Sequence, residues 1–120
     1  MNVHASADSL LYNVHDDSQV TVHVVIGDAQ GGGWVITWDS AQVIMKGSAA
    51  EVVTVGQGKE IRARTLQIVA TAIDIRQETN RLSSVITIDG GPDGTKTMVH
   101  QYGDGGTGDT AIFTTMVRFA

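Results

Sequence analysis

Polar residues in glycine-rich turns are the side chains of this sequence that could bind a ligand. If each predicted strand crosses the molecule once, the loops at residues 27–33, 47–50, 76–81 and 103–110 share one pole. Loops gathered at one end of a rigid β scaffold are a usual place for a binding site. The residues that we predict to bind a ligand at this pole are Asp28, Gln30, Trp34, Asn80, Asp104 and Asp109.

Trp34 is the aromatic residue of this set, and it allows two interpretations. It follows the three glycines Gly31 to Gly33, so it could present its ring beside a loop and stack on a sugar. It also shares one strand face with Ile36 and Trp38, which is the pattern of a tryptophan packed in the core between two sheets. The sequence leaves both interpretations open.

The glycines at 103, 105 and 108 match the spacing of the dinucleotide-binding fingerprint. That fingerprint requires a helix to begin at the third glycine. The residues that follow, Thr110 to Phe119, are β-branched and aromatic and predict a strand instead. We therefore interpret this segment as a turn and expect no nucleotide site.

Metal sites and enzyme activity have weak support in the sequence. Calcium is the one candidate cofactor, because Asp-rich and Gly-rich loops supply the oxygen ligands that it prefers. The four histidines lack ligand spacing, and the absence of cysteine excludes thiolate zinc sites and thiol nucleophiles. No Gly-x-Ser-x-Gly motif is present either. We expect a non-enzymatic protein, with a small hydrolase as a remote alternative.

The composition indicates a single globular domain of 120 residues with a weakly charged, hydroxyl-rich surface. Only 18% of the residues are charged, and the net charge is −5. An acidic chain without a basic stripe argues against nucleic acid as a partner. No apolar run approaches the length of about 18 residues that a membrane helix needs, so we expect no membrane insertion. The N-terminus lacks the features of a signal peptide, which predicts a cytoplasmic protein or export by another route.

Alternating apolar residues predict an all-β fold of about nine strands, in which the core positions recur every second residue. An antiparallel β-sandwich, immunoglobulin-like or jelly-roll, explains these short strands and Gly/Asp turns best, with a closed barrel as the lesser option. The predicted strands are Asp8–Val14, Gln19–Ile26, Trp34–Trp38, Gln42–Lys46, Glu51–Val55, the two arms within Ile61–Ile88, Thr95–Tyr102 and Ala111–Phe119.

The longest β signal, Ile61 to Ile88, predicts a hairpin whose two arms pair on either side of a turn at residues 76–81. In its first arm the apolar residues occupy even positions at the start and odd positions near the end. Because side chains alternate between faces, such a switch requires a bulge or a strand covered on both faces. We predict a bulge or crossing near residues 69–72.

These observations favour a lectin-like binding module that recognises a glycan or another small neutral ligand through loops at one pole. The alternative is a structural or self-assembling subunit that forms homo-oligomers through edge strands. For that alternative, Ala111–Phe119 is the strand that we expect to be an exposed edge.

Overall fold

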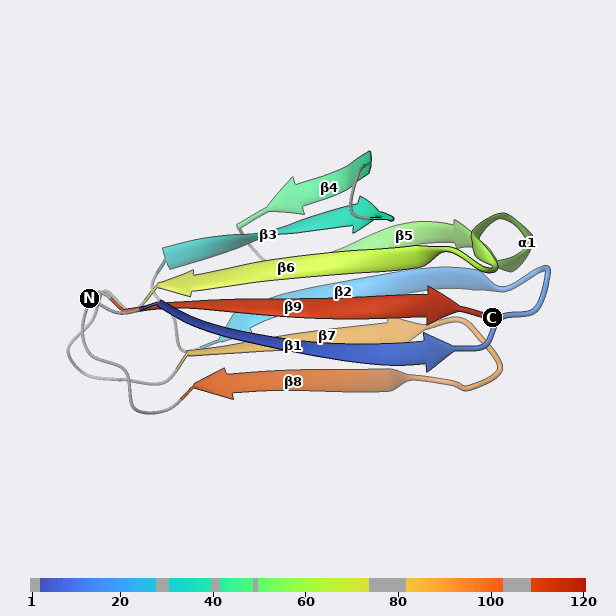
Figure 1. The fold of residues 1–120 in the computed structure, drawn as a ribbon. Helices are drawn as coiled ribbons and strands as arrows, with labels where there is room; N and C mark the ends of the chain where they lie inside the picture. Colours follow the sequence, from blue (N-terminus) through green and yellow to red (C-terminus); the bar gives the residue numbers. More distant parts are fainter. Residues whose placement is uncertain (1–2, 28–30, 40–41, 49, 74–81, 103–108) are drawn as a thin grey trace.

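A computed structural model describes residues 3–27, 31–39, 42–48, 50–73, 82–102 and 109–120. Within these residues the chain is an all-β sandwich of nine strands in two sheets, as predicted (Figure 1). One helical turn lies between the fifth and sixth strands. The elements are β1 (Val3–Tyr12), β2 (Gln19–Gly27), β3 (Gly31–Trp38), β4 (Gln42–Gly47), β5 (Glu51–Gln57), α1 (Gly58–Ile61), β6 (Thr65–Ile73), β7 (Leu82–Asp89), β8 (Lys96–Tyr102) and β9 (Thr110–Phe119).

The two sheets differ in size and share one core. The five-stranded sheet has the order β1-β9-β6-β3-β4, and the four-stranded sheet has the order β5-β2-β7-β8. All neighbouring strands are antiparallel except β1 and β9, which run parallel. The strand ends therefore gather at two poles (Figure 1). We call the pole of residue 3 the N-terminal pole and the pole of α1 and residue 120 the C-terminal pole.

The predicted hairpin between the two arms of Ile61–Ile88 is wrong. The first arm, β6, pairs with β3 and β9 in the five-stranded sheet, whereas the second arm, β7, pairs with β2 and β8 in the other sheet. The predicted turn at 76–81 lies outside the described residues. Alternation within a strand reports which face is buried, and it carries no information on whether consecutive strands pair or change sheets.

The predicted bulge near residues 69–72 is also wrong. Strand β6 keeps one continuous register with β3 and β9 from Thr65 to Ile73. Its even-numbered residues, including Ala70 and Ala72, face the core, and its odd-numbered residues face outward. The apolar side chains of Val69 and Ile73 are therefore on the outer face of the sheet rather than in the core.

A row of alternating large and small residues explains why β6 carries alanine in its centre. Phe113, Ala70, Trp34 and Gly47 are successive partners across the five-stranded sheet. A β-carbon on Gly47 would lie 2.8 Å from Cζ2 of Trp34. Small residues on both sides of the indole thus leave the space that its ring fills, in keeping with the close packing of protein interiors.

The position of the last strand contradicts the prediction that Ala111–Phe119 is an exposed edge. Strand β9 lies between β1 and β6, and its inward residues are buried. Strand β1 pairs in parallel with β9 and covers the side of β9 that was expected to be exposed. The edge strands are β1 and β4 in one sheet and β5 and β8 in the other.

Tyr12 joins the two sheets at the C-terminal pole. Its ring is fully buried and meets Phe119 edge to face, with ring centroids 6.3 Å apart. Its hydroxyl donates to the carbonyl oxygen of Gly94 at 2.6 Å and accepts from the N–H of Gly91 at 2.9 Å. Burial raises the pKa of Tyr12; the carboxylates of Asp89 and Asp93 add to the rise, while the hydrogen bond from Gly91 opposes it.

The raised pKa predicts that stability falls in alkaline solution. Because the folded chain favours the neutral phenol, this contribution is complete below the unfolded pKa of about 10 and is lost as pH rises through it toward the folded pKa. We expect the melting temperature of the wild type to fall more steeply than that of Tyr12→Phe above about pH 10. Tyr102→Phe is the control for general alkaline effects. Equal slopes in wild type and Tyr12→Phe would contradict this account.

Candidate functional site

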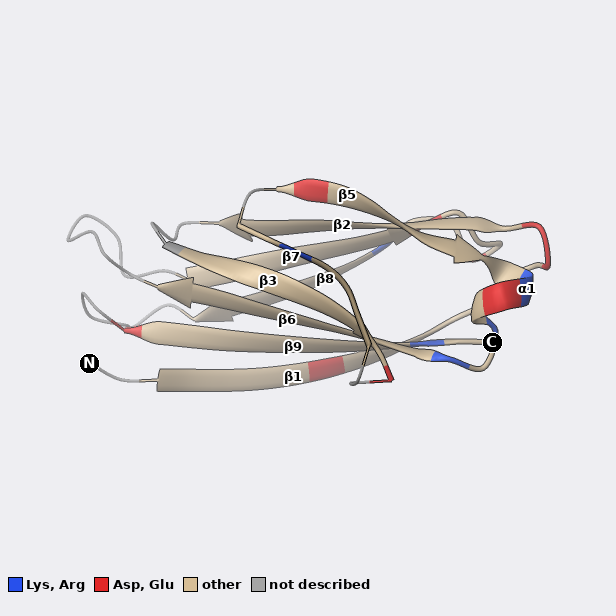
Figure 2. Cartoon of the chain, turned by 90° about the horizontal axis from the view of Figure 1, so that it is seen from above, with Lys and Arg blue, Asp and Glu red and all other residues tan. Residues whose placement is uncertain are grey.

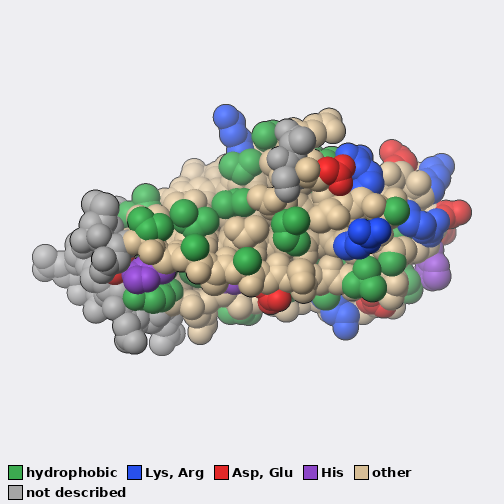
Figure 3. Space-filling view, viewed as in Figure 1, with side chains coloured by type: hydrophobic (Ala, Val, Ile, Leu, Met, Phe, Trp, Pro, Cys, Tyr) green, Lys and Arg blue, Asp and Glu red, His purple; other side chains and the backbone are tan. Residues whose placement is uncertain are grey.

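A groove on the outer face of the five-stranded sheet is the main candidate for a binding site. It lies toward the N-terminal pole, over β3 and between β4 and β6, and encloses about 610 Å³. Figure 3 looks onto this face of the molecule and shows basic side chains toward the opposite pole. The residues that line the groove are Gly32, Gly33, Trp34, Val35, Lys46, Gly47, Ser48, Val69, Thr71 and Ile73.

Two glycines of β3 create the floor of the groove. Gly32 has a φ of +136°, and a β-carbon there would lie 2.0 Å from the carbonyl oxygen of Thr71. A β-carbon on Gly33 would lie 2.9 Å from the carbonyl oxygen of Gly47. Glycine is therefore required at position 32 by both its backbone conformation and its neighbour, and at position 33 by close approach. Without side chains at these positions, the peptide backbone itself forms the floor.

The walls of the groove combine apolar surface with a few polar groups. Val35, Val69 and Ile73 supply aliphatic side chains, and Thr71 and Ser48 supply hydroxyl groups. Among the described lining residues Lys46 is the charged one, and it is exposed. Small-molecule sites are commonly apolar hollows of about 300–1,000 Å³ with a few placed polar groups. The groove has the volume and lining of such a site and is widely open to solvent.

Trp34 borders the groove, but its ring belongs to the core. Only 2% of the residue is exposed, and it packs in the same buried cluster as Ile36 and Trp38. Of the two interpretations that the sequence allowed, the core packing is therefore correct. The prediction that Trp34 offers its ring to a ligand is wrong, because a buried indole has no free face for a sugar.

Four of the predicted ligand-binding residues, Asp28, Gln30, Asn80 and Asp104, lie outside the described residues. The strand ends beside their loops can be placed. Gly31, Ile73 and Thr110 are successive partners across one sheet, and Leu82 pairs with Tyr102 in the other. All of these ends lie at the N-terminal pole (Figure 1). The strand ends beside these loops thus lie at one pole, toward which the groove also lies, while residues 28–30, 74–81 and 103–108 of the loops themselves are outside the described part of the chain.

Asp109 contacts a different part of the molecule from the groove. It is 5% exposed, and its carboxylate lies 3.3 Å from Nε2 of His4. The His4 ring stacks on Tyr102, with centroids 3.7 Å apart. His4 therefore bridges β1 to β8 across the two sheets, and Asp109, which directly precedes β9, contacts the ring of His4. We assign Asp109 a structural role, and it is not among the residues that line the groove.

A polar network continues along this seam between β1 and β8. Ser6 Oγ lies 3.2 Å from Nδ1 of His100, and Thr115 Oγ1 lies 3.2 Å from its Nε2. The hydroxyl of Ser84 is buried and has no hydrogen-bond partner among the described residues. A serine beside a histidine is the start of a nucleophile and base pair, but here a hydroxyl occupies the place of the orienting carboxylate. The network provides both ring nitrogens of His100 with hydrogen-bond partners, and the described residues around it do not supply an orienting carboxylate.

The sequence carries a signal for this seam in the polar residues at inward strand positions. His100 lies between the inward residues Met98 and Tyr102, and Thr115 lies between Phe113 and Val117. Polar residues at inward positions of alternating strands predict a buried polar contact, because buried polar groups need partners. The signal indicates that such residues meet one another, although it does not indicate which strands bring them together.

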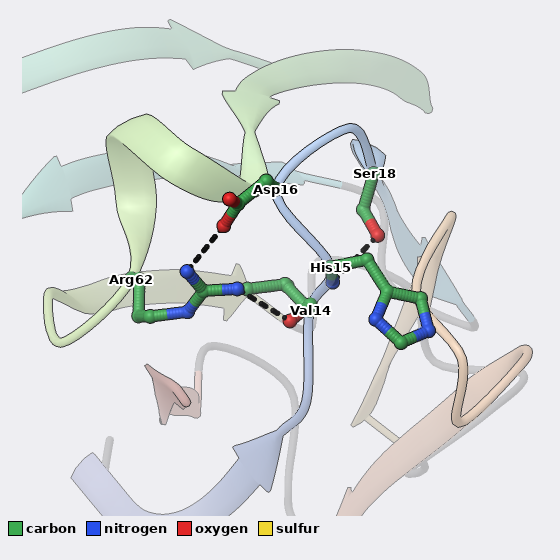
Figure 4. Close-up of polar contacts among 5 residues, drawn as sticks. All are labelled: Val14, His15, Asp16, Ser18 and Arg62. Carbon is green, nitrogen blue, oxygen red and sulfur yellow. Dashed lines mark hydrogen bonds and ion pairs between the residues drawn. The ribbon is translucent and has the colours of Figure 1, made fainter.

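Among the described residues, most of the charged ones lie toward the C-terminal pole, as Figure 2 shows. Arg62 binds the carboxylate of Asp16 and donates to the carbonyl oxygen of Val14 at 2.9 Å, which ties α1 to the turn after β1 (Figure 4). The Ser18 hydroxyl accepts from the N–H of His15 at 2.9 Å in the same turn. The Arg62 and Asp16 side chains are largely exposed, so the ion pair adds little stability. These charged side chains connect the turns at this pole to one another.

Neither metal-binding clusters nor membrane-spanning helices occur among the residues that the structure describes. Among the described residues, no group of three or more His, Cys, Asp or Glu side chains could hold a metal ion. The described segments also contain no helix that is long and apolar enough to cross a membrane. Calcium stays a prediction, since the loops at 28–30 and 103–108 lie outside the described residues.

Comparisons with known proteins add no assignment. No family model matches the chain, and no curated protein or solved structure was found to match it. Function must therefore be inferred from the geometry of the groove, the seam and the edge strands.

Proposed function

We propose that the protein is a non-enzymatic binding module that takes a small neutral ligand, with a sugar as the first candidate, in the groove over β3. The observation that carries this proposal is the groove of about 610 Å³ with its glycine floor and aliphatic walls. The walls offer packing surface, and the hydroxyls at the sides offer hydrogen bonds. The proposed site lies toward the predicted pole, and its contact residues are Val35, Val69 and Thr71 rather than Trp34.

The charges around the groove favour a neutral ligand. Among the described residues that line the groove, Lys46 is the one that is charged, and none carries a carboxylate. These residues offer a cation no counter-charge and offer an anion one exposed ammonium. Because burying a charge without a partner is costly, an uncharged molecule fits this lining best.

The geometry of β3 supports a ligand with both an apolar face and hydroxyl groups. The ladder between β3 and β4 ends at the pair Trp34 and Gly47, so Gly32 and Gly33 have register partners on β6 alone. The peptide groups of these two glycines that face β4 therefore border the groove. Together with the Thr71 and Ser48 hydroxyls they offer both donors and acceptors. The C–H face of a sugar ring could then pack on Val35 and Val69.

Ligand-observed NMR with a panel of neutral mono- and disaccharides and other neutral polar molecules tests the proposal. Val35→Arg places a long charged side chain in the groove and is expected to weaken binding at least tenfold. Val85→Arg is the matched control, because Val85 is a half-buried valine on the outer face of a central strand of the other sheet. Both variants should keep the circular dichroism spectrum of the wild type.

Two results would contradict the proposal. One is a wild-type protein that binds no member of the neutral panel. The other is a bound sugar whose affinity Val35→Arg leaves unchanged, because the ligand would then occupy another surface.

A further inference from the structure

Exposed apolar side chains gather on the edge strands of both sheets. Among the described residues, every exposed large hydrophobic side chain lies on an edge strand. Edge strands present unpaired backbone groups and are normally protected by charges or proline. Each of these edges has a single charged residue beside exposed apolar ones, which are Val3 and Leu11 on β1, Val43 and Met45 on β4, Val52 on β5 and Val99 on β8.

The four edge strands form two flanks of the sandwich. Strand β9 contacts β8, and β3 contacts β2, so β1 and β8 lie on one side while β4 and β5 lie on the other. Figure 1 shows the same arrangement, with β4 above and with β1 and β8 below. We name these the β1/β8 flank and the β4/β5 flank. Each flank has one open edge from each sheet.

The charges of the two flanks are complementary. Each edge strand contains one residue of the Lys, Arg, Asp and Glu types, and all four of these residues are exposed. In the five-stranded sheet, Asp8 is on one edge and Lys46 on the other. In the four-stranded sheet, Lys96 lies on the edge strand β8 and Glu51 on the edge strand β5. Opposite signs therefore stand at the two edges of each sheet.

We propose that copies of this chain associate head to tail, with the β1/β8 flank of one copy against the β4/β5 flank of the next. The strand directions suit this arrangement. When two copies keep the same orientation, β1 runs antiparallel to β4 of the neighbour, and β8 runs antiparallel to β5. Both sheets then continue across the contact with antiparallel hydrogen bonding, the more stable of the two ladder types.

The charges favour head-to-tail contact over a dimer in which each edge strand pairs with its own copy. A two-fold axis perpendicular to the sheets would pair β1 with β1 and β8 with β8, so Asp8 and Lys96 would each approach their own equivalent. Head-to-tail contact instead brings Lys96 and Glu51 to one edge on the same face of the sheet, because their register partners Ile88 and Val24 both face the core. A head-to-tail contact leaves one flank open on each terminal copy, so the assembly can extend into a filament or close into a ring.

The open edges of the flanks extend about 20–33 Å at about 3.3 Å per residue, since β4, β5 and β8 have six or seven residues and β1 has ten. The exposed valines Val3, Val43, Val52 and Val99 point to the outer faces of their sheets, as their register partners do. When the sheets continue across the contact, these valines gain cross-strand neighbours on the same face, which removes part of their surface from water and favours association.

Sedimentation velocity over a concentration series tests the proposal with two double variants. Val3→Lys with Val99→Lys blocks the β1/β8 flank, and Val43→Lys with Val52→Lys blocks the β4/β5 flank. All four valines are more than half exposed, so the fold should tolerate the lysines. We expect the wild type to show oligomers that grow with concentration and each double variant alone to be monomeric.

Mixing the two double variants gives the decisive result. Each retains one intact flank, so an equimolar mixture should form a dimer that neither variant forms alone, and it should stop at the dimer. Thr87→Lys with Thr114→Lys is the control, because it adds the same charge on the outer faces of two central strands. This control should assemble like the wild type.

Three results would overturn the proposal: a wild type that stays monomeric throughout the series, double variants that assemble like the wild type, or a mixture without dimers. Val35→Arg, which blocks the groove, should leave assembly unchanged. Failure of the assembly and failure of ligand binding can thus be distinguished.

Discussion

Replacing Trp34 by alanine is expected to lower the free energy of unfolding by about 3–5 kcal/mol, the range for a large aromatic side chain removed from a core. The indole is 2% exposed and fills the space between Ala70 and Gly47 in its row. Neither neighbour has a side chain that could fill the cavity. Urea denaturation followed by circular dichroism measures the effect, provided that the slope of the transition stays constant.

The adjacent residue supplies the control for Trp34→Ala. Val35 lies on the same strand but faces outward into the groove, so Val35→Ala should cost far less stability. A Trp34→Ala protein that melts like the wild type yet loses sugar binding would contradict the core assignment. It would restore the interpretation of Trp34 as a stacking platform.

Replacing Gly90 by alanine is the second substitution with a large expected effect. Gly90 has a φ of +112°, and a β-carbon there would lie 2.0 Å from the carbonyl oxygen of Gln19. Gln19 begins β2, the strand that pairs with both β5 and β7, so the obstructing atom is backbone in a paired strand. We expect a loss above about 3 kcal/mol, at the upper end of the range for point substitutions.

Gly94 in the same turn separates the steric effect from the backbone conformation. It also has a positive φ, +74°, but a β-carbon there would meet no atom within 4 Å. Gly94→Ala should therefore cost only the strain of a left-handed residue, about 1–2 kcal/mol. Equal losses for the two alanine variants in urea denaturation would show that the contact with Gln19 is unimportant.

The positions of most strands could be predicted from the sequence because burial of one face imposes alternation. The segment Gln19–Ile26 was predicted almost to its observed bounds, since its valines and isoleucine recur at even positions. Pairing between strands could not be predicted in the same way. The arms β6 and β7 each have the alternation of a half-buried strand, and that pattern is the same whether the strands form a hairpin or lie in separate sheets.

Of the predicted site residues only Trp34 and Asp109 can be placed, and both pack within the fold, while the groove lies toward the predicted pole. The sequence predicts a loop over Gly31 to Gly33 because glycine disfavours strands, yet β3 begins with them, and Gly32 and Gly33 form the groove floor. The outward position of Val69 and Ile73 was the sequence signal for the groove. It was attributed to a bulge, because apolar residues on both faces of a strand do not reveal what covers the outer face.

Amide chemical-shift mapping of the protein with the tightest-binding neutral sugar of the panel tests the central claim most directly. If the ligand occupies the groove over β3, the shifts should concentrate on Gly32, Gly33, Val35, Val69 and Thr71. Shifts confined to the β1/β8 seam or to the C-terminal pole would contradict the proposed function.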